Sequence, residues 1–127
     1  MLPPDKLDLM NEALADLYGG WHFYIRSALI VETLDRMWMR SKFQEYALHN
    51  ADQIIELGDL IMFHGGTPTT TVTAWRNDLR NPKDILLYAS NREKAMAARY
   101  DELPHVGRFR NTAVSRTNHF KQSAAGI

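Results

Sequence analysis

The sequence predicts an all-α protein, a four-helix bundle in which two antiparallel helical hairpins are joined by a long crossover. Three observations lead to this prediction. Apolar residues recur at steps of three and four over four separate segments, and proline or glycine lies at the segment ends. Residues 66–80 lack that periodicity and are rich in threonine, which favours extended backbone. A hairpin, a long connection and a second hairpin form a bundle with one crossover.

The first two helices are long and have clear boundaries. The first is expected over residues 5–33, entered through Pro3 and Pro4, which suit the start of a helix but not its interior. The second is expected over residues 39–64. It should end at Gly65 and Gly66, because glycine readily adopts the left-handed conformation that closes a helix.

The second hairpin begins with a capping sequence. Asn81 can accept hydrogen bonds from the first helical amides, and Pro82 fits the first helical position. The third helix is therefore expected to run to about residue 103, where Pro104 interrupts it. A fourth helix should cover residues 106–125.

Composition limits the classes of function. A chain of 127 residues suits one domain, residues 1–127. The absence of cysteine excludes disulfides and thiolate chemistry and favours a cytoplasmic location. No segment is long and apolar enough to span a membrane, and the N-terminus does not resemble a signal peptide. Fifteen basic and fifteen acidic residues cancel, so overall charge does not attract nucleic acid.

The charge is nevertheless uneven along the chain. Residues 103–127 contain no Asp or Glu but carry Arg108, Arg110, Arg116 and Lys121. One interpretation is a basic helix that faces an acidic neighbour. The other is a face that binds phosphate or DNA, which would need cations without internal partners. The first is favoured, and nucleic acid is not expected as a partner.

Several polar residues fall where the helical periodicity places the core. Asn50 and Gln53 lie on the apolar stripe of the second helix, and Glu93 lies at the centre of the third. In the fourth helix Arg116 lies on the stripe and His119 at its edge. A lone buried carboxylate or guanidinium costs several kcal/mol, so Glu93 and Arg116 are predicted to form a direct ion pair. The alternative is that Arg116 reaches past the stripe to water.

These residues also agree in their distance from the chain breaks. If the third helix runs parallel to the second, a rise of 1.5 Å per residue places all of them at one level, about 17 Å from one end of the bundle. They are Asp16, Asn50, Gln53, Glu93, Arg116 and His119.

Two stretches resemble bacterioferritins and related ferritin-like proteins. Residues 9–24, LMNEALADLYGGWHFY, resemble the first helix of that family, and residues 51–68, with ADQIIE followed by GGTP, resemble the end of its second helix. The resemblance implies a ferritin-like bundle. Family members hold two metal ions between one Glu from each of two helices and a Glu-x-x-His pair from each of the other two. The paired histidines of mini-ferritins are absent around His22 and His49.

The resemblance implies that three metal ligands remain. Asp16 stands where the Glu of the first helix belongs, Glu93 matches the Glu of the third helix, and His119 keeps the His of the fourth. These three residues are the candidate metal ligands. The haem-binding methionine of bacterioferritin has no counterpart, because Ala51 and Asp52 stand at that point.

The other three ligands are replaced. Asn50 and Gln53 stand for the Glu and His of the second helix, and Arg116 stands for the Glu of the fourth. Two carboxylates and an arginine do not balance two metal cations. The position is therefore interpreted as a degenerate di-iron site in which these residues form a polar network.

Two functions follow as hypotheses. In the first, the chain has lost ferroxidase chemistry, needs no cofactor and acts through assembly or a protein partner. In the second, it binds iron at an atypical site and oxidises or stores it. A homo-oligomer is expected in either case, because the apolar arc of the first helix, which includes Leu17, Trp21 and Ile25, is too wide for one bundle to cover.

Overall fold

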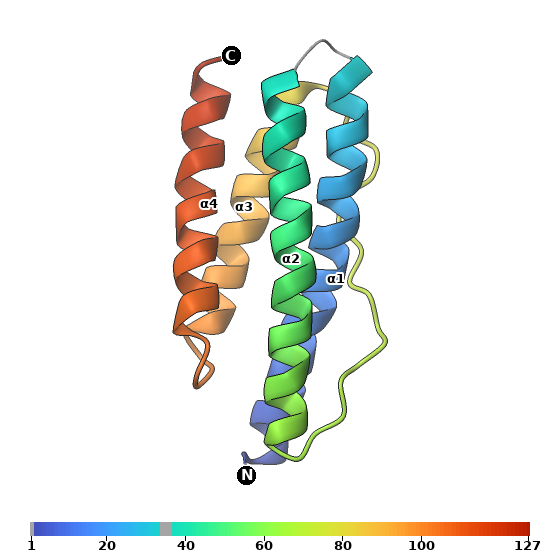
Figure 1. Cartoon of the computed structure of the whole chain (residues 1–127). Coiled ribbons are helices and arrows are strands. Elements are labelled where there is room, and N and C mark those ends of the chain that lie inside the picture. The colour runs from blue at the N-terminus through green and yellow to red at the C-terminus, as the bar shows by residue number, and fades with distance from the viewer. Residues whose placement is uncertain (1, 34–36) are drawn as a thin grey trace. The chain divides into compact units, whose positions relative to one another are not determined.

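The computed structural model describes residues 2–33 and 37–127, and for Glu32 and Thr33 it describes only the backbone. These ranges contain four helices: α1 (Pro4–Thr33), α2 (Met37–Phe63), α3 (Pro82–Tyr100) and α4 (Gly107–Ala125) (Figure 1). They fall into two compact units, Met1–Asn77 and Asp78–Ile127. None of the helices in the described ranges has the length and apolar character needed to cross a membrane.

The first unit is the α1–α2 hairpin. The stripe of α1 predicted from the sequence supplies much of its core, and Met10, Leu14 and Leu17 are at most 1% exposed. Tyr24 of α1 stacks against Phe43 of α2, with ring centroids 6.0 Å apart. Their burial is driven by the removal of apolar surface from water, which holds the two helices side by side.

The end of α2 follows the predicted capping. The amide of Gly66 donates to the carbonyl of Ile61 at 2.9 Å, and the amide of Gly65 donates to that of Met62 at 3.1 Å. Gly65 has φ of 90°, a left-handed conformation that strains residues with a Cβ. These two bonds satisfy carbonyls at the helix end and turn the chain into the crossover.

The crossover runs back along α1 and is bonded to it (Figure 1). Asn11 on α1 holds its first part through both ends of its amide: Nδ2 donates to the carbonyl of Thr67 at 3.0 Å, and Oδ1 accepts from the amide of Thr69 at 2.8 Å. Further along, the amide of Thr73 donates to the carbonyl of Ala15 at 3.0 Å. These hydrogen bonds satisfy backbone groups of the crossover, which has no regular secondary structure to satisfy them.

The second unit is the α3–α4 hairpin. Asn81 caps α3 as predicted: its side chain accepts from the amides of Lys83 at 2.9 Å and Asp84 at 3.3 Å. Between the helices, Ser90 Oγ on α3 donates to the carbonyl of Thr117 on α4 at 2.9 Å. This bond fixes where the two helices meet along their length.

The third helix ends three residues earlier than predicted, at Tyr100 rather than near residue 103. After it the chain makes short turns in which the amide of Glu102 donates to Arg99 and that of Leu103 donates to Tyr100. The reason is Pro104, whose ring restricts the residue before it and pushes it out of the helical conformation. Pro104 therefore shortens the helix at residues that precede it in the chain.

Candidate functional site

The predicted ion pair between α3 and α4 is confirmed. Arg116 Nη1 donates to Glu93 Oε1 at 3.1 Å, and each of the two side chains is only 3% exposed. The helical periodicity placed both residues on the inner stripes of their helices, and their burial agrees with this. The alternative in which Arg116 extends to water is wrong.

Pairing offsets the free-energy cost of burying these two charged groups, either of which would be costly to bury alone. A guanidinium is never deprotonated in a protein, so burying Arg116 requires an acceptor, and Glu93 is that acceptor. The Ser90–Thr117 hydrogen bond lies one helical turn away on α3 and one residue away on α4. It holds the helices in the register that brings the two charged groups together.

Three of the other four replaced or retained positions lie in the first unit and are also buried. Asp16 on α1 is 4% exposed, and Asn50 and Gln53 on α2 are 1% and 5% exposed. Asn50 lies under Gly20 of α1, because a Cβ added at Gly20 would stand 2.9 Å from Asn50 Nδ2. The lack of a side chain at Gly20 thus makes room for the amide.

The six positions divide between the units. Asp16, Asn50 and Gln53 belong to the first, while Glu93, Arg116 and His119 belong to the second. His119 is half-buried, and its ring lies 6.0 Å from that of Phe120. Their common level, and the network that would connect them, stay predictions.

The residues do not fit a dimetal centre. Such a centre needs carboxylates to balance its cations, and here one of the two available carboxylates, Glu93, is bonded to a guanidinium. Among the side chains that the structure describes, no group of three or more His, Asp or Glu is arranged to hold a metal ion. The assignment of Asp16, Glu93 and His119 as ligands stays a prediction.

Sequence reasoning missed the role of two glycines and a tryptophan. A Cβ at Gly19 would lie 1.8 Å from the carbonyl oxygen of Thr73, so only glycine lets the crossover pass this close to α1. Trp75 follows and is 6% exposed, packed against Phe23 and Tyr24 with centroids 5.3 and 5.7 Å away. Consecutive glycines inside a strongly periodic helix are the sequence signal for this approach.

The basic stretch at the end of the chain is partly neutralised internally. Of its four cations, Arg116 bonds to Glu93, and Arg110 Nε lies 2.7 Å from Asp101 Oδ1. Both acids come from α3 or the residue that follows it. At least two of the four charges thus face acidic neighbours, in agreement with the interpretation favoured from the sequence.

Comparison with known proteins shows which fold the chain has. No protein-family model and no curated protein matches the sequence. Among solved structures, the chain is similar to a ferritin from Chlorobium tepidum, with a TM-score of 0.74 and 19% identity over 99% of this chain and 77% of that one. It is also similar to an open-pore ferritin from the hyperthermophilic archaeon Archaeoglobus fulgidus, with a TM-score of 0.64 and 15% identity over 99% and 78% of the two chains.

These similarities establish the class of protein by fold. The chain has the ferritin-like fold, an all-α four-helix bundle of two hairpins, α1–α2 and α3–α4, with a crossover. The predicted fold class is confirmed. At 19% and 15% identity the comparison describes architecture, and function has to be argued from the residues themselves.

Proposed function

We propose that this chain is a ferritin-like protein that has lost ferroxidase chemistry and acts as an oligomeric structural or binding protein. The observation that carries the proposal is the buried bond between Arg116 and Glu93. In the family that the sequence resembles, both positions would be glutamates that face metal. Here one is a permanent cation, and it uses the carboxylate of the other.

The electrostatic argument is direct. Two metal ions bring four positive charges, which family members offset with four carboxylates. Replacing one carboxylate by Arg116 adds a further positive charge where negative charge is needed. A lysine could lose its proton on burial, but a guanidinium keeps its charge. Metal would therefore have to displace Arg116 from Glu93 and leave the buried guanidinium without this carboxylate.

Assembly is supported by apolar surface on the first hairpin. Ile25 and Leu29 of α1 are 39% and 56% exposed. On α2, Leu48, Ile55 and Met62 are 64%, 64% and 59% exposed and follow one another at intervals of seven residues, which places them along one face. A row of this kind is typical of a helix that packs against another chain.

Metal analysis tests the loss of chemistry. Protein purified without chelators should contain well below one iron per chain, and aerobic addition of ferrous iron should give oxidation at the rate seen without protein. One or two irons per chain with a catalysed burst would overturn the proposal. That result would favour the other hypothesis, an atypical iron site that uses Asp16, Glu93 and His119.

A further inference from the structure

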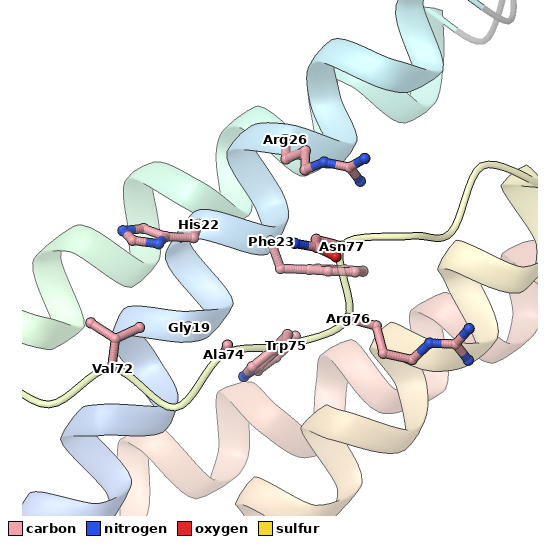
Figure 2. Close-up of a pocket in the computed structure, with 9 residues that line it drawn as sticks. All are labelled: Gly19, His22, Phe23, Arg26, Val72, Ala74, Trp75, Arg76 and Asn77. Carbon is pink, nitrogen blue, oxygen red and sulfur yellow. The ribbon is translucent and has the colours of Figure 1, made fainter.

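A pocket lies between α1 and the crossover, entirely within the first unit and separate from the Glu93–Arg116 pair (Figure 2). Its volume is about 240 Å³. The helix contributes His22, Phe23 and Arg26, and the crossover contributes Trp75 and Asn77, among others. Figure 2 shows Phe23 projecting from α1 toward the crossover segment that carries Asn77, with Arg26 extending from the next turn of α1 at the edge of the pocket.

The walls of the pocket are held in place by contacts already described. The Thr73 amide bonds to the Ala15 carbonyl, and Gly19 lets the crossover backbone approach α1 directly. Trp75 is 6% exposed, and its ring packs against Phe23 at a centroid distance of 5.3 Å. A site formed in advance in this way requires little ordering when a small molecule binds.

The charge of the lining has one sign. Arg26 and Arg76 line the pocket, and neither Asp nor Glu lines it. Arg26 is half-buried, whereas His22 and Arg76 are exposed. A partly buried guanidinium in a pocket without acids attracts an anionic group, and its planar fork matches a carboxylate or a phosphate.

The rest of the lining includes two aromatic residues and one asparagine beside small and aliphatic residues. Phe23 and Trp75 line the pocket with the small part of their surface that stays accessible, 6% of each residue, and this part favours an apolar group. Asn77 supplies an amide that can both donate and accept, so it can orient the polar end of a ligand. The volume lies just below the usual range for drug-sized ligands, so it suits one ring with a single anionic substituent.

We propose that this pocket binds a small aromatic anion, one ring that carries a carboxylate or a phosphate. The ring packs against Phe23 and Trp75, and the anionic oxygens are bound by Arg26 and oriented by Asn77. This proposal does not depend on the proposed loss of the metal site, because none of the six positions of that site lines the pocket.

The direct test is an NMR titration of the full chain that follows the indole N–H signals of its three tryptophans. Trp21→Phe and Trp38→Phe identify the signal of Trp75 by elimination, and neither of these residues lines the pocket. The ligands are benzoate and phenyl phosphate, with benzyl alcohol as a neutral ring and inorganic phosphate as an anion without a ring. Benzoate or phenyl phosphate should shift the Trp75 signal to saturation, and the tighter of the two identifies the preferred anion.

Substitution of Arg26 provides the decisive comparison. Arg26→Gln should lower the affinity of the better ligand at least tenfold, and Arg26→Lys, which keeps the charge but loses the fork, should lower it by less. Arg80 is an exposed arginine outside the pocket, so Arg80→Gln should leave the affinity unchanged. Circular dichroism melting of each variant confirms that it is folded.

Three results would overturn the proposal. One is a titration in which neither benzoate nor phenyl phosphate shifts the Trp75 signal. Another is equal affinity in the Arg26→Gln and Arg80→Gln variants. The third is binding of benzyl alcohol as tightly as the anions, which would show that the aromatic surface alone is responsible.

Discussion

Glu93 and Arg116 are 23 residues apart in the chain, yet their side chains meet at 3.1 Å between α3 and α4 and are almost completely shielded from water. Arg116→Ala should therefore destabilise the protein by about 3 to 5 kcal/mol, because the carboxylate of Glu93 is left buried without its partner. Urea denaturation followed by circular dichroism measures this loss. The double variant Arg116→Met with Glu93→Gln should recover much of it.

An exposed ion pair that also involves an arginine of α4 is a matched control. Arg110 and Asp101 lie at 2.7 Å, but their side chains are 46% and 56% exposed. Arg110→Ala should change the free energy of unfolding by at most about 1 kcal/mol, as is usual for surface ion pairs. Equal losses for Arg110→Ala and Arg116→Ala would contradict the argument from burial.

Gly19→Ala tests the close passage of the crossover over α1. The new Cβ would meet the backbone oxygen of Thr73 at 1.8 Å, so the crossover must move away and Trp75 must lose packing. We expect a large loss in the free energy of unfolding. Gly58 is also inside a helix, but a Cβ there meets nothing nearer than Pro68 Cγ at 4.0 Å. Gly58→Ala should stabilise by about 0.5 to 1 kcal/mol through helix propensity, and a loss there as large as at Gly19 would count against the steric account.

Restoring the metal ligands of the family tests the proposal that this position once bound metal and that Arg116 now prevents binding. The triple variant Asn50→Glu, Gln53→His and Arg116→Glu should bind iron, measured as metal retained per chain after anaerobic loading and gel filtration. The double variant Asn50→Glu with Gln53→His keeps Arg116 and should retain none, because the guanidinium still holds Glu93. Iron retention by the double variant would show that Arg116 is not the obstacle.

The apolar row on α2 predicts an oligomer. At micromolar concentration, light scattering should give a mass above the 14.6 kDa of one chain. Ile55→Glu places a charge in the middle of the exposed row and should lower the measured mass, whereas Gln122→Glu, a change of similar kind at an exposed position on α4, should not. A mass of one chain for the unaltered protein would contradict the prediction.

Removal of the α3 cap should have a modest and local effect. Asn81→Ala leaves the amides of Lys83 and Asp84 without their side-chain acceptor and should cost about 0.5 to 2 kcal/mol. Asn91 lies exposed inside the same helix, so Asn91→Ala should be neutral or slightly stabilising. Thermal unfolding of both variants measures the difference, which should vanish if the cap contributes nothing.

Periodicity was sufficient to predict the helices and the buried polar residues on them. It placed Asn50, Gln53, Glu93 and Arg116 on inner faces because a helix repeats every 3.6 residues whatever it packs against. The ion pair followed because a buried charge needs a partner. Sequence could therefore indicate which polar residues are buried and which two of them pair, whereas a former metal site at these positions stays a prediction.

The course of the crossover could not be predicted in the same way. Residues 66–80 have no repeat, so nothing in their pattern shows that Asn11 binds Thr67 and Thr69 or that Trp75 enters the first unit. The pocket beside Trp75 depends on that course. Pairings between distant segments are set by tertiary packing, which local patterns do not encode.

The attachment of the crossover also bears on the order of events in folding. Asn11 and its partner Thr69 are separated by 58 residues, so their contact closes a large loop, whereas α1 ends at Thr33 and α2 begins at Met37. Long loop closure is slow and costs chain entropy before any contact is gained. The hairpin should therefore form first and the crossover dock later. In the native protein the amides of Thr69 and Thr73 should exchange with deuterium sooner than those in the middle of α2, through openings that leave the hairpin intact.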